Sequence, residues 1–192
     1  MYYLYMDINA STHEIMKYFD NLFLSGNPTG SDFYWQKNFN RGNVLQEGDI
    51  FYHGFCLGIV FSWNEGHGWR ISGISKGAKF KPLLENGLKL INLYDPDFDC
   101  STIQFNKNYK VKKHIDGNNI GESYIIGLGN YSGGELIVYN ENDEPTYVDI
   151  NHKFYKFNGS KYWHETADYI GERITMVFFK LGGKHKNLTK KK

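Results

Sequence analysis

The feature that most constrains the fold is a succession of short strand-like segments between residues 101 and 181. They are rich in β-branched and aromatic residues and are separated by turn signals such as Gly-x-Gly-Asn, Asn-Glu-Asn-Asp-Glu-Pro and Asn-Gly-Ser. Strand spacing this regular predicts a β-sandwich or a jelly roll. The expected strands are 101–109, 123–128, 135–139, 146–150, 153–157, 161–164 and 173–180.

The N-terminal half mixes helix and strand signals. Residues 2–8 are expected to form a strand. A helix is expected from about 12 to 24, because Ser11-Thr-His-Glu14 has capping-box spacing and apolar residues follow at helical spacing. Residues 51–61 are typical of a buried strand, and a second helix at 82–93 has Pro82 in its first turn. With these helices supporting one sheet, the expected class is α+β, mainly β.

Length and composition indicate a single domain. The chain has 192 residues, of which 17% are aromatic, with 21 Gly and only 4 Pro, which favours a β-rich core with tight turns. We expect one domain at 1–183, with helices and support strands in 1–100 and the core in 101–181. A basic tail at 184–192 carries five lysines and no acid. The near balance of 22 basic and 21 acidic residues neither demands nor excludes a nucleic-acid partner.

Targeting and redox signals point to an intracellular protein, either cytoplasmic or nuclear. The N-terminus has no basic region followed by an apolar run, and no stretch contains 18 consecutive apolar residues. We therefore expect neither a signal peptide nor a membrane span nor a membrane partner. Cys56 and Cys100 are expected to be reduced thiols and not a disulfide framework.

Five residues form a candidate metal and anion site. His114 and Asp116 are two apart, so on a strand both side chains face the same way, and His164 comes from a distant strand. Two His and one carboxylate with the other positions open suit non-haem Fe(II). Arg173 follows His164 by nine residues and shares a strand face with Thr175. A guanidinium fork and a hydroxyl together suit a small carboxylate.

This set resembles the signature of the Fe(II)/2-oxoglutarate dioxygenases. The resemblance implies a double-stranded β-helix, a cupin-like jelly roll, with buttressing N-terminal helices. It also implies that His114, Asp116 and His164 bind Fe(II) and carry the catalysis, while Arg173 and Thr175 hold the distal carboxylate of 2-oxoglutarate. Further implied are O2 as co-reactant, ascorbate as a reductant, and oxidative decarboxylation coupled to hydroxylation of a substrate C–H bond.

One branch of the family matches further. The run Ile125-Ile-Gly-Leu-Gly-Asn-Tyr-Ser-Gly-Gly-Glu-Leu136 is similar to the "LGDYTGGEL" run of the TET and J-binding-protein group. That resemblance implies oxidation of the 5-methyl group of 5-methylcytosine or thymine in DNA. It also implies that Asn119, three residues after the metal Asp, contacts a flipped base. Alternatively, Gly117-Asn-Asn119 is an ordinary turn.

Other interpretations remain open at this stage. The Gly-Gly-Glu-Leu run also occurs in prolyl-hydroxylase-like oxygenases, so the substrate is alternatively a protein side chain or a small molecule. A non-redox cupin or a binding module without chemistry could keep the fold. His53 and His67 are further ligands or ordinary histidines, and Lys110-Val-Lys-Lys113 contacts phosphate or is a solvated strand edge. Further cosubstrate or second-sphere contacts are expected among three residues, Asn106, Tyr109 and Tyr124.

Overall fold

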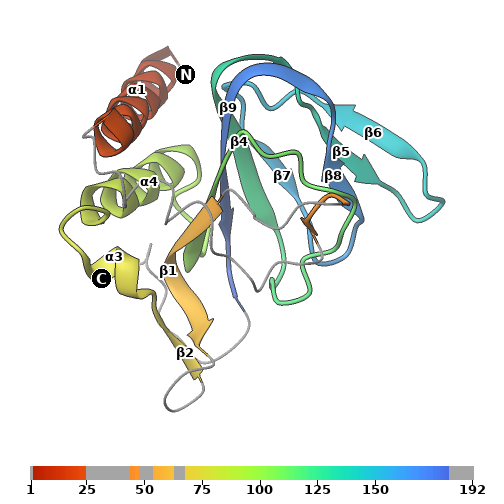
Figure 1. Ribbon diagram of the computed structural model, residues 1–192, viewed down its shortest axis with the longest axis horizontal. Coiled ribbons are helices and arrows are strands. Elements are labelled where there is room, and N and C mark those ends of the chain that lie inside the picture. The colour runs from red at the N-terminus through yellow and green to blue at the C-terminus, as the bar shows by residue number, and fades with distance from the viewer. Residues whose placement is uncertain (1, 25–43, 48–53, 63–67, 182–192) are drawn as a thin grey trace.

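Helices cover one face of a large sheet, and a smaller sheet lies beyond it (Figure 1). The computed structural model describes residues 2–24, 44–47, 54–62 and 68–181. Helices α1 (Tyr2–Leu24) and α4 (Lys81–Tyr94) lie side by side, with the short α3 (Gly73–Lys76) near the β1–β2 ribbon. Helix α4 packs tightly on the sheet, because a Cβ on Gly87 would lie 2.7 Å from Cδ1 of Ile103.

The strands among the described residues form two antiparallel sheets. The six-stranded sheet has the order β2-β1-β3-β9-β4-β7, and the three-stranded sheet has the order β6-β5-β8. The bounds are β1 (Gly54–Ser62), β2 (Gly68–Ile71), β3 (Thr102–Lys107), β4 (Ser123–Gly133), β5 (Leu136–Tyr139), β6 (Pro145–Val148), β7 (Tyr155–Phe157), β8 (His164–Thr166) and β9 (Tyr169–Phe179).

The chain passes back and forth between the two sheets from β3 onward. After β3, residues 111–114 extend the smaller sheet, since Thr166 N donates to Val111 O and His114 exchanges two backbone hydrogen bonds with His164, each 3.0 Å long. The chain then forms β4 in the larger sheet and β5 and β6 in the smaller sheet. It continues with β7 in the larger sheet, β8 in the smaller sheet and finally β9 in the larger sheet. This interleaving of eight segments in two sheets is a jelly roll, as the sequence predicts.

Strands β3, β4 and β9 have two different faces. On β3, Ile103 and Phe105 point into the helix-covered core, while Gln104 and Asn106 alternate with them and line a cavity between the sheets. The core also contains Phe19 of α1, whose ring centroid lies 5.4 Å from that of Phe105. The remaining buried core residues are Ile15, Phe55, Leu57, Phe80, Leu83, Leu90, Ile91, Phe98, Cys100, Tyr124, Ile126, Leu128, Ile174, Met176 and Phe178.

The expected strand at residues 2–8 is wrong, because α1 begins at Tyr2. The capping-box residues lie inside the helix, where Thr12 Oγ1 donates to the carbonyl of Asn9 at 2.9 Å instead of capping an end. Ile15 and Phe19 continue the buried face begun by Ile8. The aromatic β-propensity of the first residues is a weak signal that this helical period overrides.

An expected turn and the start of an expected strand are also placed differently. Gly127-x-Gly-Asn130 lies within β4, which pairs with β9 from Tyr124 to Gly133. Gly129 has φ +104° and approaches the opposite strand so closely that a Cβ would lie 2.3 Å from Glu172 O. The strand expected at 161–164 is wrong at its start, because the amides of Lys161 and Tyr162 both donate to Asn158 O in a turn, and β8 starts only at His164.

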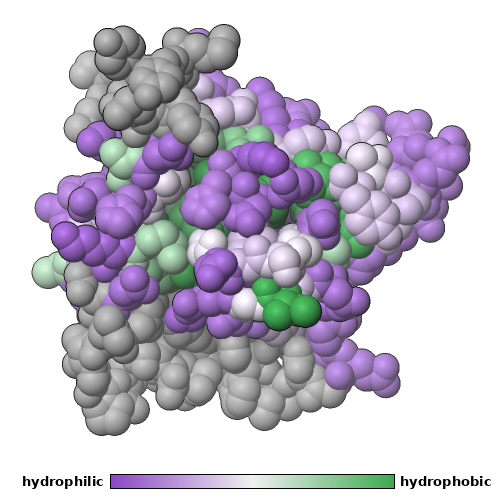
Figure 2. All heavy atoms as spheres, turned by 90° about the horizontal axis from the view of Figure 1, so that it is seen from above, coloured by the Kyte–Doolittle hydropathy of each residue, from purple (hydrophilic) through white to green (hydrophobic). Residues whose placement is uncertain are grey.

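The other predicted elements are confirmed with shifted ends, including the helix at 82–93, the strand at 101–109 and the part of 51–61 that lies within β1. No helix in the described part of the chain combines the length and apolarity needed to cross a bilayer. Viewed from above, the described surface is mainly hydrophilic, with small separate apolar areas (Figure 2).

Candidate metal and anion site

His114, Asp116 and His164 converge between the two sheets. His114 Nε2 lies 3.5 Å from Asp116 Oδ1, and His164 Nε2 lies 3.7 Å from Asp116 Oδ2. One ligand atom from each residue fits within 4.8 Å of the others. Ligand atoms at right angles around one ion, each ~2.1 Å from it, lie about 3 Å apart, so a small contraction would close this group on an ion.

Both imidazoles are held in the tautomer that a metal requires. His114 Nδ1 lies 2.8 Å from Lys112 O, and His164 Nδ1 lies 3.0 Å from Tyr162 O. A carbonyl only accepts, so each Nδ1 carries a proton, and a neutral imidazole in this tautomer presents its Nε2 lone pair towards Asp116. Burial lowers the pKa of His164 and keeps that lone pair available. The exposed fractions of His114 and His164 are only 7% and 5%.

Asp116 lies outside regular strand, in a loop held by neighbours on two sides. Its amide donates to Gly159 O at 2.9 Å, and Asn119 Nδ2 donates to its Oδ2 at 3.0 Å. Gly159 leaves no room for a side chain, because a Cβ there would lie 2.8 Å from Asp116 Oδ2 and 3.3 Å from His164 Cε1. The strand period therefore does not account for the convergence of His114 and Asp116, which depends on this loop.

Arg173 is buried at another part of the same cavity and is 3% exposed. Its Nη2 donates to Gly134 O at 2.9 Å, and its guanidinium carbon lies 5.5 Å from the ring centroids of both Tyr131 and Tyr169. Its Nε has no hydrogen-bond partner among the described residues. Burial lowers the Arg173 pKa, although a guanidinium stays cationic at neutral pH. A buried cation with an unused donor is a receptor for an anion.

The cavity joins the metal candidates to Arg173. Thr175 lies on the same face of β9 as Arg173, and Asn106 Nδ2 donates to its Oγ1 at 2.9 Å. The lining residues are Gln104, Asn106, Val111, His114, Asp116, Asn119, Ile125, Leu136, Phe157, His164, Glu165, Thr166, Arg173, Thr175, Val177 and Phe179. All six residues predicted for the site, with Asn119 as the tentative one, therefore border one cavity.

Some expected contacts lie elsewhere. Tyr124 faces the helix side of β4, where its hydroxyl donates to Asp95 Oδ2 at 2.9 Å, so the cosubstrate contact expected of it is wrong. Tyr109 does not line the cavity, and its hydroxyl accepts from the amide of Gln46. Asn106 does line it. Sequence reasoning missed Gln104, Tyr131, Tyr169 and Gly159, although the two-residue alternation on β3 points from Asn106 to Gln104.

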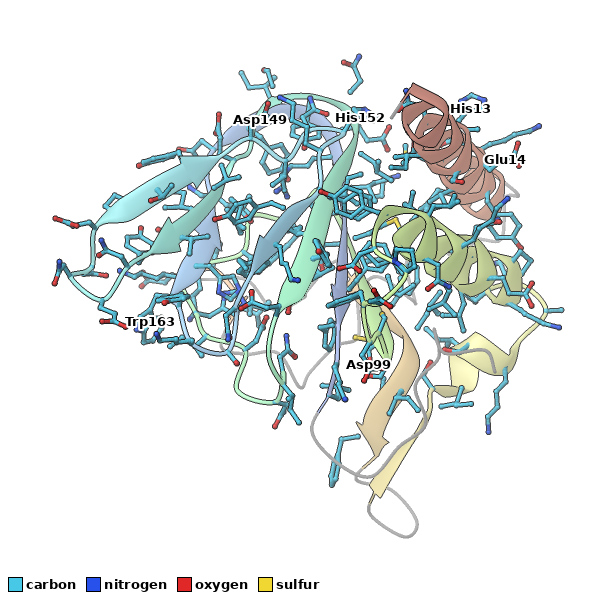
Figure 3. The ribbon with its side chains drawn as sticks, turned by 180° about the vertical axis from the view of Figure 1, so that it is seen from behind. His13, Glu14, Asp99, Asp149, His152 and Trp163 are labelled. Atoms are coloured by element: carbon cyan, nitrogen blue, oxygen red, sulfur yellow. The ribbon has the colours of Figure 1, made fainter. Side chains whose placement is uncertain are left out.

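The two other described histidines, His13 and His152, do not line the cavity. His13 projects from α1, and His152 lies at the end of the sheets nearest that helix, whereas Trp163, next to His164 in the chain, lies far from both (Figure 3). His53 and His67 lie outside the described residues. In the basic cluster at residues 110–113, Lys110 pairs with Asp168 and Lys113 pairs with Asp143. These carboxylates offset part of the positive charge that would attract a phosphate group.

Comparison with known proteins places the fold. A prolyl hydroxylase from Trichoplax adhaerens, solved with a hypoxia inducible factor oxygen degradation domain peptide fragment, aligns with a TM-score of 0.54 and 13% identity, covering 90% of this chain and 78% of that one. This likeness shows the fold, and confirms the predicted jelly roll.

Two other solved structures align over less than two thirds of their own length. An oxidoreductase of the 2OG-Fe(II) oxygenase family from Burkholderia pseudomallei has a TM-score of 0.47 and 15% identity, with 66% of each chain covered. NgTET1 in complex with 5mC DNA has a TM-score of 0.44 and 17% identity, with 66% of this chain and 60% of that chain covered. No family model and no curated protein matches the sequence.

Proposed function

We propose that this chain is an Fe(II)- and 2-oxoglutarate-dependent oxygenase that hydroxylates a C–H bond, with residues 1–183 as one domain. The observation that carries the proposal is one cavity with a His-Asp-His group in one part and a buried arginine with an unused donor in another. A non-redox cupin would need the first part but would have no use for the second.

In this proposal His114, Asp116 and His164 would hold Fe(II), since two imidazoles and one carboxylate are a donor set that suits this ion. Their geometry fits, since both Nε2 atoms and the carboxylate already face a common point. When bound, iron and 2-oxoglutarate supply oxygen activation, in which the cosubstrate is converted to succinate and carbon dioxide as a substrate C–H bond is hydroxylated. The protein orients the ligands through Lys112 O, Tyr162 O and the Asn119 amide.

Arg173 and Thr175 are proposed to bind the distal carboxylate of 2-oxoglutarate. The Arg173 Nε donor is unpaired within the described residues, and Tyr131 and Tyr169 flank the guanidinium so that it is shielded from water. Apolar side chains along the same cavity, including Val177 and Leu136, exclude further water from the reacting groups.

The proposed substrate is the 5-methyl group of 5-methylcytosine or thymine in DNA, on the strength of the Ile125–Leu136 run. Asn119 lies at the cavity and uses one N–H on Asp116, which leaves its carbonyl and second N–H for a base edge. The basic tail at 184–192, outside the described residues, would add sequence-independent attraction to phosphate.

A second candidate substrate is a protein side chain. The specific observation in its favour is the pairing of Lys110 with Asp168 and of Lys113 with Asp143, which offsets part of the positive charge beside the site. A substrate without phosphates would not need that charge.

Two assays test the proposal. Succinate release from 2-oxoglutarate with Fe(II) and ascorbate should occur without any substrate, and its absence together with tight binding of other metals would favour a cupin. Mass spectrometry of nucleosides, after incubation with DNA containing thymine, cytosine or 5-methylcytosine, should detect a hydroxymethyl base. Hydroxylation of peptides and not of DNA would refute the nucleic-acid substrate and leave the oxygenase chemistry standing.

A further inference from the structure

We infer that a chain of side chains from β1 through β3 to β9, buried from Gln104 onward, orients the Thr175 hydroxyl as a donor to the cosubstrate's distal carboxylate, so that Gln104 and Asn106 act as positioning residues. Cys56 Sγ lies 2.7 Å from Gln104 Oε1, Gln104 Nε2 lies 3.0 Å from Asn106 Oδ1, and Asn106 Nδ2 lies 2.9 Å from Thr175 Oγ1. The inference rests on the proposed function.

The register of the strands builds this chain. Cys56 of β1 lies opposite Gln104 of β3, and Asn106 of β3 lies opposite Thr175 of β9. Residues two apart on β3 share a face, so Gln104 and Asn106 also reach each other. The exposed fractions of Gln104, Asn106 and Thr175 are 1%, 7% and 2%, so water does not compete for these bonds.

A backbone carbonyl sets the direction of the chain. Gln104 Nε2 lies 2.8 Å from Phe105 O, which can only accept, so this end of the Gln104 amide must be its nitrogen. The second hydrogen of that nitrogen then donates to Asn106 Oδ1, and Asn106 must turn its own NH2 towards Thr175. Reversing either amide would set two acceptors or two donors against each other.

The hydroxyl group of Thr175 remains available as a hydrogen-bond donor. Its oxygen accepts from Asn106, so its O–H is directed to another acceptor, on the strand face that also carries Arg173. The Arg173 Nε is an unpaired donor among the described residues. A group that meets both finds only donors, which favours a carboxylate over a carboxamide or a methyl group.

The test is a double-mutant cycle read by ligand binding without turnover. Calorimetry would measure the binding of 2-oxoglutarate to the Mn(II)-loaded protein in the absence of oxygen. Asn106→Leu keeps the branched outline of the side chain and removes its hydrogen bonds to Gln104 and Thr175. It should weaken binding about tenfold, because the hydroxyl is no longer held towards a charged acceptor. In a Thr175→Val background the same change should cost less than about twofold, since no hydroxyl remains to orient.

A ligand control separates orientation from damage. 2-Oxopentanoate carries a methyl group in place of the distal carboxylate, and its affinity should be the same in the parent and in Asn106→Leu. Gln104→Met breaks the preceding hydrogen bond of the chain, the one from Gln104 to Asn106. It should weaken the binding of 2-oxoglutarate by a smaller factor than Asn106→Leu does, and should leave the binding of 2-oxopentanoate unchanged. It decides the matter if Asn106→Leu does not fold.

Equal losses in both Thr175 backgrounds would overturn the inference, because Asn106 would then contact the ligand directly or act on the whole fold. Unchanged 2-oxoglutarate affinity in Asn106→Leu and Gln104→Met would also overturn it, while leaving the proposed function intact. A parent protein that binds neither 2-oxo acid would refute the proposed function itself.

Discussion

Gly159 offers a direct test of the metal site without altering any proposed ligand. A Cβ at this position would lie 2.8 Å from Asp116 Oδ2, whereas ordinary contacts begin at 3.4 Å. Gly159→Ala must therefore displace the carboxylate by about 0.6 Å, and metal sites tolerate about 0.2 Å in a ligand distance. The new methyl group cannot simply move away from Asp116, because it would also lie 3.3 Å from His164 Cε1 and 3.2 Å from Phe157 Cε2.

We expect Gly159→Ala to weaken metal binding about 10- to 100-fold, the range seen when groups that orient metal ligands are changed. Gly117→Ala is the matched control, since nothing lies within 4 Å of a Cβ there and it adds the same methyl group beside Asp116. Competitive titration of Fe(II) or Mn(II) against a chelator measures the affinity, and thermal unfolding of the metal-free proteins checks the fold. Equal metal affinity in the parent and Gly159→Ala would refute the proposed position of the ion.

Three further predictions concern the proposed ligands. Arg173→Met should raise the 2-oxoglutarate concentration needed for half-maximal succinate release about 100-fold, because it removes charge-assisted hydrogen bonds. Arg173→Lys should show a smaller rise, and the Fe(II) affinity should be unchanged in both variants. An unaltered 2-oxoglutarate dependence would place the carboxylate elsewhere. His114→Ala should abolish succinate release and weaken Fe(II) binding by more than ~100-fold, and near-parental activity would exclude the site. Asn119→Ala should weaken Fe(II) binding about tenfold through Asp116, and should reduce turnover on methylated DNA further than uncoupled succinate release if Asn119 also contacts the base.

The strand pattern of the C-terminal half was sufficient to predict the jelly roll, because each segment combines alternation with a turn signal. It failed where a glycine signals close approach and not reversal, as at Gly129. The prediction from β-propensity also failed at the N-terminus, where the packing of Ile15 and Phe19 favours a helix that extends back through the expected strand at residues 2–8. In both places the deciding contact comes from a distant part of the chain, which local sequence does not reveal.

The spacing of His114, Asp116, His164 and Arg173 identified groups that the fold does bring to one cavity. Spacing could not show which atoms hold these side chains in place, because the supporting groups are mainly backbone carbonyls and a glycine that leaves space for them. Lys112 O and Tyr162 O fix the two tautomers, and Gly159 supplies the room. Any residue type provides a carbonyl, so no sequence motif records it.

Strand β9 explains how a fold can retain a buried, incompletely paired arginine. Ile174, Met176 and Phe178 face the helix-covered core, while Arg173 and Thr175 alternate with them and face the cavity. Burying a cation costs free energy, and the apolar face of the same strand provides compensating stabilisation. Pairing of Arg173 with an anionic ligand would recover part of that cost only in the bound state. We therefore expect the proposed site to favour a carboxylate over a neutral group, because an anion recovers part of the desolvation cost that Arg173 incurs on folding.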